Sequence, residues 1–129
     1  MKFTQHLDPN INLIRHYEPG LVEVNQKKLT QSCIITQKTL KPEWSVDSIQ
    51  TLNQDHIQQL LDLNPEVLIL GTGDTQVFPP AELFGYCARQ GVSLEVMNNA
   101  AACRTYNVLT TEQREVVVGL IIESKPLQN

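Results

Sequence analysis

A short apolar run that stops in a glycine-containing loop constrains the fold of this chain more than any other feature. Residues 67–70 read Val-Leu-Ile-Leu, and the polar loop of residues 71–76, Gly-Thr-Gly-Asp-Thr-Gln, follows without a break. Four aliphatic residues bounded by turn signals have the length of a strand, and a run without alternation is typical of a strand covered on both faces. We therefore expect residues 67–70 to form a central strand of a sheet.

A helix and a second strand are predicted after this loop. Pro79-Pro80 suits the first turn of a helix, the following segment carries an apolar stripe, and Gly91 is suited to its carboxyl-terminal cap. Residues 92–97 then form another strand. Strand, helix and strand in this order predict a parallel unit with a right-handed crossover, and hence an α/β domain.

The amino-terminal third is predicted to be an antiparallel β-meander. Residues 13–17 and 21–24 are short alternating runs, and Glu18-Pro19-Gly20 between them is a strong turn signal. Residues 29–36, with Cys-Ile-Ile at their centre, are expected to continue the meander as its third strand.

Asn53 is expected to cap a helix that ends near Asn64-Pro65, because a residue before proline avoids the helical conformation. Two short helices are expected after Met97, the second opened by a capping box of Thr110 and Gln113. Residues 116–122 are ambiguous, since their β-branched residues favour a strand while the capping signal favours a helix. We assign helix to about Gly119, a short strand afterwards and a frayed tail from residue 124.

Composition excludes several classes of function. The 129 residues fit one domain, and 10 basic against 14 acidic residues give a formal net charge of −4. No global positive field attracts nucleic acid, so we expect no nucleic-acid partner. No apolar run approaches the about 20 residues that cross a bilayer, so we expect no membrane insertion.

The cysteines and histidines point to neither a disulfide framework nor a metal site. Cys33, Cys87 and Cys103 are odd in number and widely separated, which predicts free thiols in a reducing compartment. The three histidines show no ligand spacing, so we expect no metal. The first eight residues lack the apolar core of a signal peptide, and we expect a cytoplasmic protein.

Polar residues follow both strands of the predicted parallel unit, at the strand ends where α/β proteins bind ligands. We expect these residues to frame one polar cleft. The candidate cleft residues are Gly71, Thr72, Gly73, Asp74, Thr75, Asn98, Asn99, Cys103, Arg104 and Thr105.

Two of these residues have both a chemical and a structural interpretation. Arg104 can grip a small anion bidentately, or it can pair with Asp74 or Glu95 and only join two loops. Cys103 can be activated by Arg104 and a helix start, or it can pack as a small apolar residue. We favour packing for Cys103 and leave both interpretations of Arg104 open.

The glycine loop resembles a dinucleotide-binding turn only in part. Gly71 and Gly73 match the first two glycines of the pattern, but Gln76 stands where the third belongs. Pro79-Pro80 also delays the helix whose amino terminus would hold the pyrophosphate. We therefore expect no dinucleotide and no other cofactor.

Three segments together resemble the Mth-like family of small domains. They are Ile-Leu-Gly-Thr-Gly at residues 69–73, the motif Asn-Ala-Ala-Ala-Cys-Arg-Thr-Tyr-Asn-Val-Leu at residues 99–109, and Glu-Gln-Arg-Glu-Val at residues 112–116. The family includes an assembly factor of mitochondrial respiratory complex I and an adipogenesis-associated animal protein. The resemblance implies a single mixed three-layer α/β domain over residues 1–129, and it implies protein interaction rather than catalysis.

We therefore expect a non-catalytic accessory factor that binds a protein partner. The resemblance marks Gly71, Thr72, Gly73, Asn99, Cys103, Arg104 and Asn107 as motif positions without assigning them chemistry. The alternative is a small-anion or metabolite-binding protein, or an enzyme that uses Asp74 as acid or base, Arg104 as anion clamp and Cys103 as nucleophile.

Overall fold

The computed structural model describes residues 10–123, which contain two β-sheets and three α-helices. The predicted tail from residue 124 lies outside the described residues. The elements are β1 (Ile14–Glu18), β2 (Leu21–Val24), β3 (Lys27–Leu29), β4 (Cys33–Thr36), β5 (Leu40–Lys41), the 3₁₀ turn η1 (Ile49–Thr51), α1 (Gln54–Leu61), β6 (Val67–Gly71), α2 (Ala81–Arg89), β7 (Leu94–Met97), α3 (Asn99–Thr111) and β8 (Val116–Leu120).

The larger sheet has five strands in the order β5-β4-β8-β6-β7. Strand β6 pairs in parallel with β7 on one side and with β8 on the other, whereas β4 pairs antiparallel with β8. The prediction that residues 67–70 form an interior strand of a parallel β-α-β unit is therefore confirmed. The carboxyl ends of β6 and β7 lie in register, with Gly71 opposite Met97.

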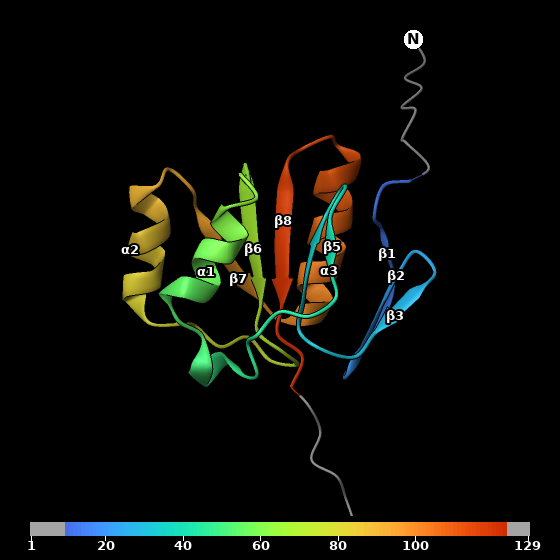
Figure 1. The fold of residues 1–129 in the computed structure, drawn as a ribbon, viewed down its shortest axis with the longest axis horizontal. Coiled ribbons are helices and arrows are strands. Elements are labelled where there is room, and N and C mark those ends of the chain that lie inside the picture. Colours follow the sequence, from blue (N-terminus) through green and yellow to red (C-terminus); the bar gives the residue numbers. More distant parts are fainter. Residues whose placement is uncertain (1–9, 124–129) are drawn as a thin grey trace, which may run out of the picture.

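Each face of this sheet is covered by a layer of its own (Figure 1). Helices α1 and α2 cover one face, and α3 together with the small sheet β1-β2-β3 covers the other. Along β6 the side chains alternate between the layers: Leu68 and Leu70 face α1 and α2, and Ile69 faces α3. The predicted mixed three-layer α/β fold is confirmed.

The predicted antiparallel meander is present, but the segment predicted as its third strand is wrong. The hairpin of β1 and β2 turns at Gly20 as expected, with a φ of 88°. The third strand is the short β3, whereas Cys33–Thr36 forms β4 and joins the larger sheet beside β8. Cys33, Ile34 and Ile35 are all buried, and only a strand with a layer on each side can bury consecutive residues.

The prediction of two helices after Met97 is wrong. One helix, α3, runs from Asn99 to Thr111, and Thr110 lies buried in its last turn instead of capping a new helix. Gln113 has a φ of 63°, and the Arg114 N–H donates to the Leu109 carbonyl at 3.1 Å. This pattern ends a helix, because a residue with positive φ just after the last turn reverses the chain.

The helix assigned up to Gly119 is also wrong, because residues 116–120 form the central strand β8. Every residue of β8 is buried between β4 and β6. A strand in that position suits Val-Val-Val, since β-branched side chains pack well on a sheet that is covered on both faces.

Local signals located the ends of α1 and α2 correctly. The Asn53 side chain caps α1 by accepting from the His56 N–H at 3.1 Å. Pro80 immediately precedes α2, and Gly91 follows it with a φ of 78°, as expected for a carboxyl-terminal glycine.

Candidate functional site

Asn99 is the residue that joins the two predicted walls of the site. It lies at the start of α3, is only 1% exposed, and exchanges two hydrogen bonds with Gly73. The Gly73 N–H donates to Asn99 Oδ1 at 3.1 Å, and the Asn99 N–H donates to the Gly73 carbonyl at 2.8 Å. The Asn99 Nδ2 group also donates to the Ile121 carbonyl at 3.0 Å and to the Tyr17 hydroxyl at 3.2 Å. Its amide is therefore fully used inside the protein.

The glycine at position 71 is required by this close packing. A Cβ atom there would lie 2.4 Å from Asn99 Oδ1 and 2.7 Å from Leu120 Cδ2, which are both impossible contacts. Gly73 serves the turn, since its φ of 108° is strained for any other residue. The two glycines thus have structural reasons that involve no ligand.

Thr72 closes the loop that these glycines begin. Its buried hydroxyl donates to the Thr75 carbonyl at 2.7 Å and accepts from the Val77 N–H at 3.0 Å. Asp74 and Thr75 remain exposed at the tip. The loop is therefore a rigid turn that presents Asp74 and Thr75 to solvent.

Tyr17 of β1 connects this loop to the opposite layer. Its hydroxyl donates to Asp74 Oδ1 at 3.3 Å and accepts from Asn99. Burial raises the pKa of Tyr17, the Asn99 hydrogen bond opposes that shift, and the Asp74 charge adds to it. The phenol therefore stays protonated at neutral pH and remains a donor to Asp74.

Beside Tyr17, a small pocket lies between β1 and α3; we call it the β1–α3 pocket. It encloses about 220 Å³. Its lining residues are Ile14, Arg15, His16, Tyr17, Ala100, Cys103, Arg104 and Asn107. Arg15 and Arg104 are exposed, and neither makes an ion pair within residues 10–123. His16 lies 2.8 Å from Glu18. The pocket thus carries two free guanidinium groups.

Asn107 holds the two walls of this pocket together. Its side chain accepts from the Ile14 N–H at 2.9 Å and donates to the Ile14 carbonyl at 2.7 Å, much as a neighbouring strand would. Ile14 is thereby fixed in the core, and the next residue, Arg15, lies at the surface. This double hydrogen bond brings Arg15 to the same pocket as Arg104, although 89 positions separate them in the sequence.

Cys103 lines the β1–α3 pocket but is poorly suited to act as a nucleophile. It is 5% exposed and packs with Ala102 and Tyr106 in the core on the α3 side of the sheet. Burial raises its pKa to about 12, and the nearby Arg104 offsets only part of that shift. Because the thiolate is the reactive form, the protonated thiol favours the packing interpretation.

The predicted site residues do not all face one cleft. Residues 71–75 and Asn99 belong to one hydrogen-bonded network, and Asn98 caps α3 by accepting from the Ala101 N–H at 2.8 Å. Cys103 and Arg104 lie in the β1–α3 pocket. Thr105 lines a different pocket beside Met97 and Leu109. Ligand binding by these residues stays a prediction.

The structural interpretation of Arg104 named two acidic partners, and neither is paired with it. Among the described residues, Asp74 accepts from Tyr17, and Glu95 accepts from Ser93 at 3.0 Å. Sequence reasoning missed Arg15 as a neighbour of Arg104. No local signal could have identified it, since its only mark is an exposed position in an alternating strand.

These observations define a class: a small mixed α/β domain whose glycine turn is fastened by an asparagine at a helix start, beside a basic pocket between β1 and α3. The chain belongs to the DUF498/DUF598 family, described as proteins of unknown function, whose model matches residues 14–121. This family, the complex I assembly factor and the Mth938-like structure reported below together confirm the resemblance noted from the sequence motifs.

Three known proteins illustrate the relationship. A protein of Francisella tularensis named "13 kDa major membrane protein" is 37% identical over 103 residues, which cover 79% of this chain and 84% of that protein. In Xenopus tropicalis, "NADH dehydrogenase [ubiquinone] 1 alpha subcomplex assembly factor 3" is 30% identical over 76% of this chain, but the match spans only 54% of that protein. The solution structure of a Bordetella pertussis protein described as a Mth938-like domain has a TM-score of 0.80 at 27% identity, covering 98% of this chain and 96% of its own.

Two further findings concern the described part of the chain. Over residues 10–123, no helix has the length and apolar character needed to cross a membrane. In the same part of the chain, no three His, Cys, Asp or Glu side chains are grouped so that they could hold a metal ion.

Proposed function

We propose that this protein is a non-catalytic, cytoplasmic accessory factor that binds an acidic segment of a partner protein at the β1–α3 pocket. The observation that carries the proposal is the pair of guanidinium groups, Arg15 and Arg104, that line one pocket without an ion pair in residues 10–123. A guanidinium group can form two parallel hydrogen bonds with one carboxylate. Carboxylates of a partner would also relieve the repulsion between the positive charges of Arg15 and Arg104.

The size of the pocket favours a side chain over a whole metabolite. Its volume of about 220 Å³ lies below the range of about 300–1,000 Å³ that is usual for small-molecule sites. An Asp or Glu side chain on a larger partner needs far less space. The partner's remaining contacts would then fall on the surface around the pocket.

That surface has an apolar residue in a suitable place. Val108 is 55% exposed and lies four residues after Arg104, so both are on the same face of α3. Arginine is enriched at protein interfaces, and Val108 would add apolar contact area beside Arg104. The name of the Xenopus relative, an assembly factor, also agrees with an interaction role.

The enzymatic alternative has weaker support. It requires Asp74 as acid or base and Cys103 as nucleophile, but burial keeps the Cys103 thiol protonated at neutral pH. Asp74 is an exposed acceptor for Tyr17. Nucleic acid is not proposed as a partner, because the formal net charge is −4.

The test is affinity capture from the native host with wild-type protein and two charge-reversal variants. Arg104→Glu places a negative charge in the pocket. Arg89→Glu makes the same change at the exposed end of α2, outside the β1–α3 pocket, and is the matched control. Thermal melts check that both variants fold.

We expect one or more proteins to be recovered with the wild type and with Arg89→Glu. With Arg104→Glu their recovery should fall at least about tenfold, since the attraction between Arg104 and an acidic partner becomes a repulsion. Equal recovery with all three proteins would contradict binding at this pocket. The absence of any reproducible partner would contradict the interaction role itself.

A further inference from the structure

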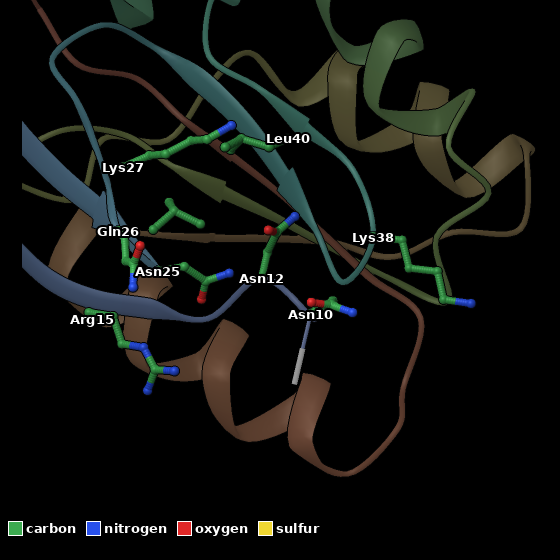
Figure 2. Close-up of a pocket in the computed structure, with 9 residues that line it drawn as sticks. Asn10, Asn12, Arg15, Asn25, Gln26, Lys27, Lys38 and Leu40 are labelled. Atoms are coloured by element: carbon green, nitrogen blue, oxygen red, sulfur yellow. The ribbon is translucent and has the colours of Figure 1, made fainter. Parts of the chain in front are cut away.

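A second and larger pocket lies between the small sheet and the β4–β5 turn; we call it the intersheet pocket. It encloses about 640 Å³. Three basic residues from separate parts of the chain line it: Arg15 of β1, Lys27 of β3, and Lys38 between β4 and β5. Figure 2 shows these three residues at the periphery of the pocket around the side-chain amides of Asn12 and Asn25, with the charged ends of Arg15 and Lys38 directed outward.

The walls of the intersheet pocket are tied together by these two amides. Asn12 Nδ2 donates to the carbonyls of Thr36 and Thr39 at 3.0 and 3.1 Å, which fastens the segment before β1 to the β4–β5 turn. Asn25 accepts from the Leu13 N–H at 3.1 Å, and its Nδ2 donates to the Ile11 carbonyl, also at 3.1 Å. The pocket is therefore held open before any ligand arrives, which lowers the entropic cost of binding.

The charge of the intersheet pocket is opposite to that of the whole chain. The lining contributed by residues 10–123 includes no Asp or Glu, and within those residues Arg15, Lys27 and Lys38 make no ion pair. The complete chain nevertheless has a formal net charge of −4. A local excess of three uncompensated, exposed cations around the rim of a hollow attracts anions.

We propose that the intersheet pocket binds a small soluble organic anion with two or more phosphate groups. Its volume lies in the range of small-molecule sites, unlike that of the β1–α3 pocket. Three cations on different elements can contact separate phosphate groups, and lysine and arginine are the residues that bind phosphate. The exposed Gln26 amide at the β2–β3 turn adds a neutral polar group for the rest of the molecule.

The test uses sodium tripolyphosphate as the probe, titrated into the full-length protein and followed by amide NMR and by calorimetry. Sodium chloride at matched ionic strength controls for general screening. The variants are Lys27→Gln, Lys38→Gln and the double variant. Lys28→Gln is the matched control, since Lys28 is the next residue of β3, is also exposed, and does not line the intersheet pocket.

We expect saturable binding, with shifts at residues 25–27 and 36–39. Each single variant should weaken it about tenfold, the double variant about a hundredfold, and Lys28→Gln less than about twofold. The proposal is overturned if no saturable binding is seen at about 10 mM probe, or if Lys28→Gln weakens binding as much as Lys27→Gln. It is also overturned if the shifts fall only around Arg104.

Arg15 lines both pockets, but this test and the partner-capture experiment change different residues. Lys27 and Lys38 do not line the β1–α3 pocket, and the capture experiment changes neither residue. Failure of one proposal therefore leaves the other intact.

Discussion

Replacing Asn99 with alanine should destabilise this domain far more than the same change at its neighbour, Asn98. The Asn99 side chain makes three hydrogen bonds, and two of its partners are backbone groups, the Gly73 N–H and the Ile121 carbonyl. Alanine leaves both of them without their side-chain partner. A buried polar group left without a partner costs about 1–3 kcal/mol.

The expected loss follows from these contacts. Two orphaned backbone groups at about 1.5 kcal/mol each give a loss of about 3 kcal/mol in the free energy of unfolding. The half-buried Tyr17 hydroxyl keeps Asp74 as a partner and adds little. Asn98→Ala removes one helix cap, to the Ala101 N–H, and should cost about 1 kcal/mol.

Urea unfolding measures both variants. The chain has a single tryptophan, Trp44, which is 5% exposed in the native state, so its fluorescence reports the transition. Hydrogen exchange at the Gly73 amide should also accelerate in Asn99→Ala, because that N–H donates to the lost side chain. If Asn99→Ala lowers the free energy of unfolding no more than Asn98→Ala does, Asn99 is not the structural link between the glycine turn and α3.

Two further predictions concern packing and thiol chemistry. Gly119→Ala should lower the free energy of unfolding by about 1–3 kcal/mol, because the new Cβ would lie 2.8 Å from the Trp44 ring and 3.1 Å from Leu60 Cδ1. The control Gly85→Ala, in α2, should be neutral or stabilising. Equal stability of the two variants would contradict this packing. Cys103 should be alkylated much more slowly in the folded protein than in a denatured control at pH 8, since its pKa rises from 9.0 to about 12 on folding. Equal labelling rates in the folded and denatured protein would contradict the burial of Cys103. Because the pKa of Cys103 is higher in the folded state than in the unfolded state, the protonated thiol stabilises the native state below about pH 9, and this contribution to stability should be lost progressively as the pH rises toward 12.

Local sequence patterns were sufficient to assign those helices and strands whose start or end signals lie within a few residues. The uninterrupted run before Gly71 identified β6, and Asn53 and Gly91 marked the start of α1 and the end of α2. These signals work because capping and positive-φ turns depend on nearby backbone groups alone. The β6-α2-β7 unit and the α/β class follow from them.

Residues 33–36 and 116–120 could not be assigned in the same way. Both segments are apolar enough for more than one structure, and only pairing with each other in the five-stranded sheet makes them β4 and β8. The capping signal of Thr110 was misleading because Thr110 is buried at the end of α3. Tertiary burial on both faces overrides such local preferences.

The sequence by itself determined the α/β class, the glycine turn and the capped start of α1. The tertiary structure alone decided which basic residues line a common pocket. Arg15 and Arg104 line one pocket because Asn107 holds β1 against α3, and Lys27 and Lys38 line another whose walls the asparagine amides tie together. These juxtapositions depend on hydrogen bonds between residues far apart in the chain, and no local pattern encodes which distant segments such amides will join.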